Sequence, residues 1–306
     1  MHETASHALV LTSAGRPGVL DTDIVDDVER LALDREPVMG TRWLAPHAAW
    51  EALLAPSSVQ ALAELRERVT TRTSGRPIDV NIVPADPGSR RKKLLVADME
   101  STIIEQECLD EIADFAGLRT RIANITERAM RGELDFAAAL RERVGLLGGL
   151  DASVLERVYE RVTLMPGAAT LVATMRRSGA VCALVSGGFT FFTERVAALL
   201  GFDIQQANTL QLKDGRIAGT VQAPILGREA KLAALQRLAR EHRLDAPMTM
   251  AVGDGANDLA MLEAAGLGVA FRAKPIVAAA AAASVTHGDL TALLYLQGYT
   301  RAEFAT

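Results

Sequence analysis

Three short apolar runs constrain the fold more than any other feature of this chain. They lie at residues 94–97, 181–185 and 248–252, and a helical pattern follows each of them. Runs without regular polar alternation are typical of parallel strands that are buried on both faces. The pattern predicts an α/β fold, with a doubly wound, Rossmann-like parallel sheet at its core.

The stretch from 103 to about 164 separates the first two runs and has helical patterns throughout, with no strand candidate. We interpret it as a helical cap inserted into a core formed by residues 90–102 and 165–306. Within that core, Asp214-Gly215 lies between two alternating segments, which predicts a β-hairpin.

The first 86 residues predict a separate, small α/β domain. Alternating apolar stretches at 8–11 and 78–83 flank two helical patterns at 19–33 and 58–69. Turn-forming residues and a basic run then cover 84–93, where we place the boundary to a second domain of residues 87–306. Two domains suit a chain of 306 residues.

Charge and apolar content exclude several classes of protein. With 33 Lys and Arg against 38 Asp and Glu, the net charge is −5, so no overall basic field would hold nucleic acid or anionic lipid. The longest uncharged alanine-rich run, 275–286, is too short to cross a bilayer, and no signal-peptide pattern opens the sequence. We therefore expect a cytoplasmic protein. Cys108 and Cys182 have no metal-ligand spacing and predict neither a disulfide framework nor a zinc site.

A polar residue ends each of the three predicted strands: Asp98, Ser186 and Asp254. The carboxyl ends of parallel strands line the ligand crevice of such a sheet, so these side chains should converge. Any one of them alone would be explained as a helix cap. Three together favour a functional site.

The neighbours of these residues indicate a metal ion and a phosphate. Glu100 follows Asp98 closely, and Asp254 and Asp258 share a glycine-flanked turn; such carboxylates suit Mg²⁺ and would repel one another without a cation. Ser186-Gly187-Gly188 would offer a hydroxyl and backbone N–H groups to an anion at a helix start. Lys231 could neutralise that anion, although a lysine on a helix is usually solvated.

These residues together resemble the four motifs of the haloacid dehalogenase superfamily of phosphatases. The motifs are, in chain order, 98–102 (DMEST), 186–189 (SGGF), Lys231 and 253–258 (GDGAND). Within that superfamily the chain resembles the phosphoserine phosphatases at 104–112 (IEQECLDEI), at 129–132 (AMRG) with Asp135 and Phe136, and at 140–144 (LRERV). The resemblance covers about residues 93–294. The first domain lies outside it and is similar to the ACT-like, regulatory N-terminal portion of longer bacterial members.

The resemblance implies a Mg²⁺-dependent enzyme that hydrolyses O-phospho-L-serine, the last step of serine biosynthesis, through an aspartyl-phosphate on Asp98. Mg²⁺ would be bound by Asp98, the backbone oxygen of Glu100 and Asp254, with Asp258 in support. Ser186, the Gly187 N–H and Lys231 would bind the phosphoryl oxygens. Glu100 would act as the general acid and base.

Substrate selection would fall to the cap and to the last motif. By resemblance, Glu107 would receive the ammonium of phosphoserine and Arg143 its carboxylate, while Met130 and Phe136 shield the pocket and Asn257 adds a further substrate contact. Taken singly, Glu107 and Arg143 are equally explained as exposed helix charges. The implied partner is a small molecule, with neither nucleic acid nor membrane involved, and a homodimer is left open.

One residue departs from the pattern of the superfamily, because position 100 normally holds Asp and this chain has Glu100. An extra methylene moves the carboxyl by roughly a bond length, and a displacement of ~1 Å can cost on the order of 10²-fold in rate. Two alternatives stay open. One is a related phosphatase or phosphotransferase for another small phosphomonoester such as phosphohomoserine; the other, suggested by Glu100 and by the unexplained first domain, is a catalytically weak, serine-binding sensor.

Overall fold

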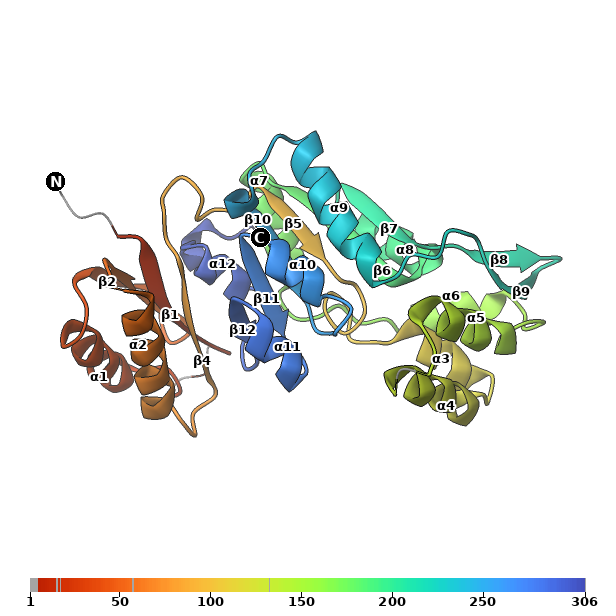
Figure 1. Cartoon of the computed structure of the whole chain (residues 1–306), viewed down its shortest axis with the longest axis horizontal. Coiled ribbons are helices and arrows are strands. Elements are labelled where there is room, and N and C mark those ends of the chain that lie inside the picture. The colour runs from red at the N-terminus through yellow and green to blue at the C-terminus, as the bar shows by residue number, and fades with distance from the viewer. Residues whose placement is uncertain (1–4, 15, 17, 57, 132, 306) are drawn as a thin grey trace.

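The computed structural model describes residues 5–14, 16, 18–56, 58–131 and 133–305; the side chain of Met130 lies outside this description. Three parts follow one another along the longest axis in Figure 1: an N-terminal sheet with two helices, a central six-stranded sheet, and a group of four helices at the opposite end. In the described parts of the chain, no helix combines the length and the apolar composition needed to span a bilayer.

The central sheet is parallel throughout, with strand order β12-β11-β10-β5-β6-β7. Its strands are β5 (Leu94–Ala97), β6 (Val181–Phe189), β7 (Ile204–Asn208), β10 (Thr249–Gly253), β11 (Leu267–Phe271) and β12 (Ala283–Val285). The three predicted strands correspond to β5, β6 and β10. These lie side by side in the middle of the sheet.

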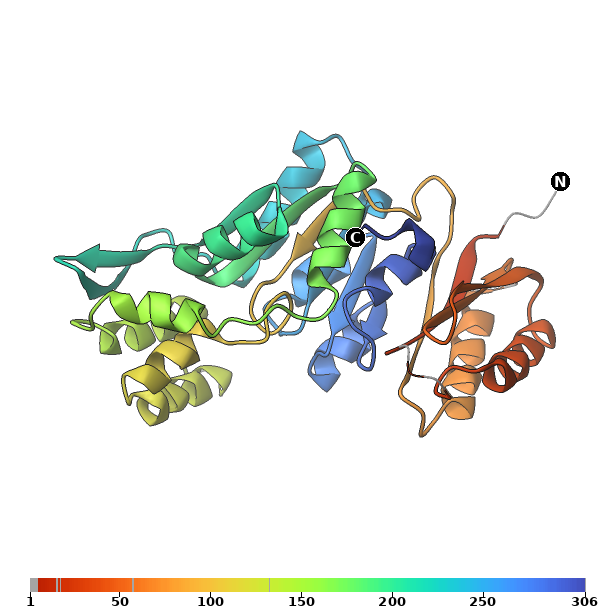
Figure 2. The ribbon, with the colours of Figure 1, turned by 180° about the vertical axis from the view of Figure 1, so that it is seen from behind.

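Helices cover both faces of this sheet, as the fold class predicted. They are α7 (Ala168–Arg177), α8 (Thr190–Leu200), α9 (Arg228–Glu241), α10 (Leu259–Ala264), α11 (Pro275–Ala280) and α12 (Ala292–Leu296). Leu94 and Val96 pack with residues of α9 and α10, whereas Leu95 and Ala97 pack with residues of α7 and α8. Figure 1 shows the first pair of helices in front and Figure 2 the second. The doubly wound α/β prediction is confirmed.

One prediction about β6 is wrong. Ser186-Gly187-Gly188 does not begin a helix, because β6 continues to Phe189 and α8 starts only at Thr190. The pairing with β7 is interrupted after Val185 and resumes where Phe189 opposes Asn208. Ser186-Gly187-Gly188, the segment expected to bind phosphate, therefore lies in an irregular strand end. Its N–H groups are not used in the pairing of β6 with β7.

The four helices at the far end form a cap between β5 and α7. They are α3 (Cys108–Phe115), α4 (Arg119–Met130), α5 (Phe136–Leu146) and α6 (Ser153–Tyr159). The predicted hairpin, β8 (Leu210–Lys213) and β9 (Arg216–Val221), reaches out from the core and bonds to this cap. Ile217 exchanges backbone hydrogen bonds with Gly149 and Leu150, each at 2.8 Å.

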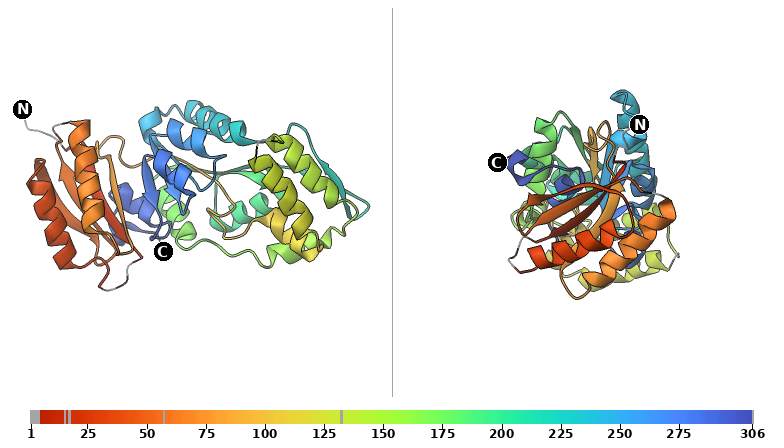
Figure 3. Two further views of the ribbon diagram at one scale, coloured as in Figure 1. Left: turned by 60° about the horizontal axis from the view of Figure 1, so that its bottom comes forward. Right: turned by 90° about the vertical axis from the view of Figure 1, so that its left-hand side faces the viewer.

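The N-terminal part is an antiparallel sheet of order β2-β3-β1-β4 with two helices. Its elements are β1 (His7–Ser13), α1 (Thr22–Leu33), β2 (Val38–Ala45), β3 (Ala49–Leu54), α2 (Val59–Arg72) and β4 (Ile78–Pro84). Leu9 and Leu11 of β1 pack in one core with residues of α1 and α2, while Ala8 and Val10 belong to the core of the central part. Figure 3 shows this unit from two further sides.

Polar contacts also join the N-terminal sheet to the central part. The carboxylate of Asp79 on β4 accepts hydrogen bonds from the backbone N–H groups of Thr286, His287 and Gly288, at 2.8 to 3.1 Å. The buried Glu51 on β3 pairs with Arg90 just before β5. The N-terminal sheet is therefore fixed on the edge of the central sheet by both apolar and polar contacts.

Candidate active site

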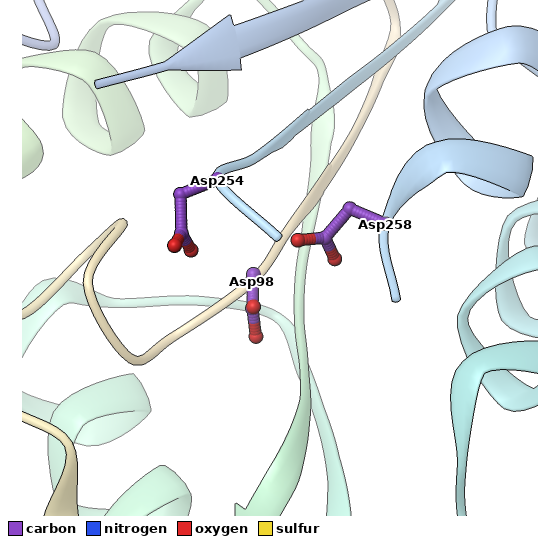
Figure 4. A group of neighbouring side chains, drawn as sticks. All are labelled: Asp98, Asp254 and Asp258. Atoms are coloured by element: carbon purple, nitrogen blue, oxygen red, sulfur yellow. The ribbon is translucent and has the colours of Figure 1, made fainter. Parts of the chain in front are cut away.

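Three carboxylates meet at the carboxyl ends of two adjacent strands. Asp98 follows β5, Asp254 follows β10, and Asp258 stands at the start of α10; Figure 4 shows their side chains facing a common space. One oxygen of each lies within 4.8 Å of one oxygen of the others. Because β5 and β10 are paired in parallel, the fold brings together acids that are far apart in the sequence.

Lys231 holds two of these carboxylates from the side of α9. Its Nζ lies 2.7 Å from Oδ2 of Asp98 and 2.6 Å from Oδ1 of Asp258. The lysine is only 2% exposed. A lysine on a helix is usually solvated. Here the ammonium group is instead enclosed between two buried carboxylates, which orient it.

The charges of the site do not balance within the protein. Burial raises the pKa of Asp98 to about 7 even though Lys231 opposes this, and burial followed by the charge of Asp258 raises the pKa of Asp254 to about 6. Burial lowers the pKa of Lys231, but the two carboxylates overcome this and raise it to about 12. Three acids thus share one lysine, and a hard cation with oxygen ligands fits that donor set.

The end of β6 carries the glycines that face the site. Oγ of Ser186 accepts a hydrogen bond from the Gly188 N–H at 2.9 Å. The buried Asn208, at the end of β7, donates to the carbonyl oxygens of Gly187 and Leu226, at 2.8 and 3.0 Å, and accepts from the Leu226 N–H at 2.7 Å. Asn208 therefore fastens the end of β6 to the segment that leads into α9.

The carboxylate of Glu100 lies against this same strand end. It accepts a hydrogen bond from the Cys108 N–H at 2.8 Å, and a Cβ placed on Gly188 would come within 2.9 Å of its Oε2. Burial, together with the charge of Glu107, raises the pKa of Glu100 to about 8 although the Cys108 N–H opposes the shift. A carboxyl that holds its proton near neutrality can donate it to a leaving group.

Comparison with known proteins identifies the family. The family model of haloacid dehalogenase-like hydrolases matches residues 95–263. A phosphoserine phosphatase of Streptomyces coelicolor is 46% identical over 239 residues, which are 78% of this chain and 58% of the relative. A probable phosphoserine phosphatase of Schizosaccharomyces pombe is 36% identical over 95% of both chains. A haloacid dehalogenase family hydrolase from Salmonella enterica, solved as a crystal structure, superimposes with a TM-score of 0.81 at 31% identity, covering 95% of this chain and 98% of its own.

The chain belongs to the haloacid dehalogenase-like hydrolase family. The resemblance drawn from the four motifs, and the narrower one to phosphoserine phosphatases, is confirmed by these matches. The chain spans 58% of the length of the Streptomyces relative and 55% of a phosphoserine phosphatase of Mycobacterium tuberculosis.

In this hydrolase the cap places one aromatic ring directly over the glycines of the core. Phe136, the first residue of α5, lies so close that a Cβ on Gly187 would meet its ring at 3.2 Å and one on Gly227 at 3.1 Å. The ring therefore covers the end of β6 and the start of α9. A bulkier residue at either glycine would push the ring away.

Two charged residues of the cap region, Glu107 and Arg143, lie near enough to the site for their charges to act on each other, and Glu107 also acts on Glu100. Oε1 of Glu107 accepts a hydrogen bond from the hydroxyl of Ser101 at 2.7 Å. Arg143 on α5 is half-buried; burial lowers its pKa, whereas the charges of Asp110, Glu100 and Glu107 raise it. The guanidinium therefore lies close enough to these acids to interact with their charges. Among the described residues, only its Nε donates a hydrogen bond, to the Ala139 carbonyl, so its other N–H groups can bind an anionic ligand.

Met130 and Asn257 were also expected to bind substrate. The side chain of Met130 lies outside the described part of the chain. Asn257 is half-buried, and its side chain folds over Gly255, where a Cβ would come within 2.2 Å of its Oδ1.

Sequence reasoning missed Asn208, and it gave Thr102 no role of its own within the motif 98–102. The hydroxyl of Thr102 donates to Oδ1 of Asp254 at 3.2 Å and orients that carboxylate. Asn208 ends the segment Ile204–Asn208, which is too polar to be recognised as a strand of a buried sheet. If β7 had been predicted, Asn208 would have been recognised as a polar residue at the end of a fourth strand, like Asp98, Ser186 and Asp254.

Proposed function

We propose that this protein is a Mg²⁺-dependent phosphomonoester hydrolase that converts O-phospho-L-serine to L-serine and inorganic phosphate. The proposal rests on the charged groups that meet at Asp98. The Nζ of Lys231 lies 2.7 Å from its Oδ2, and one carboxylate oxygen each of Asp254 and Asp258 lies within 4.8 Å of its carboxylate. The likeness to phosphoserine phosphatases supports the choice of substrate.

Asp98 is the proposed nucleophile. One of its carboxylate oxygens forms a bond to phosphorus while the bond from phosphorus to the serine oxygen breaks, which leaves an aspartyl-phosphate. Lys231 fixes the orientation of Asp98 and offers positive charge to the phosphoryl oxygens. Asp98, the backbone oxygen of Glu100 and Asp254 would bind Mg²⁺, which neutralises phosphoryl charge when bound.

Glu100 is the proposed general acid and base. Its proton passes to the serine oxygen as that oxygen leaves, and the resulting carboxylate then removes a proton from the water that attacks the aspartyl-phosphate. Phosphate departs and Asp98 is regenerated. The hydrogen bond from the Cys108 N–H and the close contact with Gly188 hold the longer Glu side chain in one orientation.

Glu107 and Arg143 supply the two charges that an amino acid requires. We infer that Glu107 receives the ammonium group and Arg143 the carboxylate, while Phe136 closes the pocket above Gly187. Excluding water at this point strengthens the electrostatic interactions of the site.

The test is phosphate release from a short panel of substrates, with Mg²⁺ and then with EDTA. Phosphoserine should be preferred over phosphohomoserine and over phosphoethanolamine, which lacks the carboxylate. Arg143→Ala should raise KM for phosphoserine far more than for phosphoethanolamine. Arg141→Ala, at an exposed arginine of the same helix, is the matched control and should change neither.

One result would reject the role of Arg143, and another would reject the proposed activity itself. Equal effects of Arg143→Ala on both substrates would remove Arg143 from carboxylate recognition. Serine binding without any Mg²⁺-dependent turnover would establish the sensor in place of the enzyme.

A further inference from the structure

A cavity lies between the N-terminal sheet and the C-terminal segment of the chain. Its volume is about 370 Å³, within the range of small-molecule sites. None of the candidate active-site residues whose side chains the structure describes lines it. The lining includes Ser13, Thr170, Asp289, Tyr295, Arg301 and Phe304. Residues from both ends of the sequence thus enclose one space away from the catalytic carboxylates.

Two opposite charges border this cavity without neutralising each other. No ion pair joins Asp289 to Arg301 in the described structure, and the guanidinium of Arg301 has no hydrogen-bond partner among the described residues. Oδ1 of Asp289 accepts from the N–H and the hydroxyl of Thr291, which leaves Oδ2 with no such partner there. One anionic and one cationic group therefore each retain binding capacity.

Tyr295 lines the same cavity as these two charges. Burial raises the pKa of Tyr295 to about 12, and on its hydroxyl Arg301 and Asp289 act in opposite directions. The ring of Tyr295 stacks at a tilt on Phe304, with centroids 5.1 Å apart. The cavity thus combines a charged pair, hydroxyl groups and an aromatic wall.

We propose that this cavity is a binding site for a small zwitterion, an α-amino acid, whose carboxylate pairs with Arg301 and whose ammonium group pairs with Asp289. A ligand with only one of the two charges would leave the other group of the pair unsatisfied, which costs affinity. The aromatic pair and the hydroxyl groups of Ser13 and Thr170 would surround the remainder of the ligand.

A backbone hydrogen bond links the cavity to the segment that follows the cap. The turn that carries Asp289 holds the segment by which the chain returns from the cap to the core, since the Leu290 N–H donates to the Pro166 carbonyl at 3.0 Å. Gly167 has a left-handed backbone (φ +85°), and a Cβ there would lie 2.7 Å from the Thr291 nitrogen. A ligand bound to Asp289 would therefore contact the turn that is hydrogen-bonded to the C-terminal end of the cap segment.

Two readouts follow from this arrangement. The first is binding itself, measured as the shift in unfolding temperature and by calorimetry, which requires no turnover. The second is a change in KM for phosphoserine, which rests on the proposed function. Binding without an effect on phosphoserine hydrolysis would leave the site intact and reject only its coupling to the cap.

The experiment uses the full chain and each proteinogenic amino acid at millimolar concentration. We expect at least one to raise the unfolding temperature, and its N-acetyl and methyl-ester derivatives, which each lack one charge, to bind about tenfold more weakly or worse. Arg301→Met and Asp289→Asn should each weaken binding of the free amino acid to a similar degree. Arg240→Met, at an exposed arginine outside the cavity, should not.

The active site could itself bind an amino acid, so a further variant separates the two locations. Binding that survives Arg143→Ala but is lost in Arg301→Met supports the proposal. Binding that is lost in Arg143→Ala and retained in Arg301→Met overturns it, and so does the absence of any amino acid that shifts the unfolding temperature. Because Arg301 is exposed, its replacement by Met is compatible with folding, which the unfolding curve verifies.

Discussion

The carboxylate of Glu100 rests against Gly188, so closely that a Cβ on the glycine would lie 2.9 Å from Oε2. The extra methylene of Glu, relative to the Asp usual in this superfamily, is thus accommodated where the neighbouring strand end has no side chain. The Cys108 N–H donates a hydrogen bond to the same carboxylate. Position 100 and position 188 should therefore behave as a coupled pair.

A double-mutant cycle measures this coupling. Gly188→Ala should lower kcat by on the order of 10²-fold, because the new methyl group displaces the acid by about 1 Å. In the Glu100→Asp background the shorter side chain leaves room, so the same substitution should cost much less, with a coupling energy of about 1 to 2 kcal/mol.

Gly187→Ala is the matched control for that cycle. Its Cβ would meet the ring of Phe136 at 3.2 Å and not the acid. Glu100→Asp should therefore not relieve it. Additive effects of Gly188→Ala and Glu100→Asp would show that the two positions act independently.

Removing the charge of Glu100 should stabilise the metal-free protein, more so at higher pH. Burial raises the pKa of Glu100 from 4.5 to about 8, so between these values the folded state holds a proton that the unfolded state has lost. Stability attributable to this group therefore falls as pH rises from 4.5 to 8. In EDTA, the gain in unfolding temperature of Glu100→Gln over the parent should grow across that range.

The comparison for this pH series is Glu263→Gln, at an exposed glutamate of α10. It should give a difference from the parent that does not grow with pH. A pH-independent gain for Glu100→Gln would contradict the assignment of a buried, proton-holding carboxyl at position 100. Activity of Glu100→Gln should fall by about 10²- to 10⁴-fold.

Asn208 is expected to act as a positioning residue. Asn208→Asp keeps the shape but loses both donors to Gly187 and Leu226, which should destabilise the protein by about 1 to 3 kcal/mol and loosen the end of β6. At a temperature where the variant is fully folded, kcat should still fall. Asn124→Asp, at an exposed position of α4, is the control; a normal kcat in folded Asn208→Asp would reduce Asn208 to a structural role.

Magnesium should stabilise the protein through the three carboxylates. Mass action predicts about 2.7 kcal/mol at a Mg²⁺ concentration 100 times Kd, seen as a rise in unfolding temperature that EDTA reverses. Asp254→Asn should abolish most of the rise, whereas Asp245→Asn, at an exposed residue before the 3-10 helix Ala246–Met248, should leave it unchanged. An equal rise in both variants would place the ion elsewhere.

The central part of the fold was predictable because hydrophobic patterning dominates it. Residues 94–97 are buried on both faces and read as a continuous apolar run, so β5 and its polar end at Asp98 follow from the pattern. The same reasoning fails for β7, whose sequence IQQAN has too little apolar content, and for β2, where Gly40 and Arg42 interrupt the alternation. Those strands exist because neighbouring strands supply their hydrogen bonds.

The site was predictable in its charges and less so in its geometry. The carboxylates stand out at strand ends, but the burial of Lys231 depends on two acids that its own helix does not contain. The course of β6 beyond Ser186 depends on pairing with Asn208, which no local pattern encodes. Tertiary contacts decide both features.

The central claim is that a phosphoryl group is carried transiently on Asp98. The most direct measurement mixes the protein with Mg²⁺ and phosphoserine labelled in its phosphoryl group, quenches in acid within the first turnover, and maps the label by peptide. The account predicts label on the peptide that contains Asp98, and none in Asp98→Asn. Turnover with label on a different residue, or with no labelled protein at any time point, would contradict it.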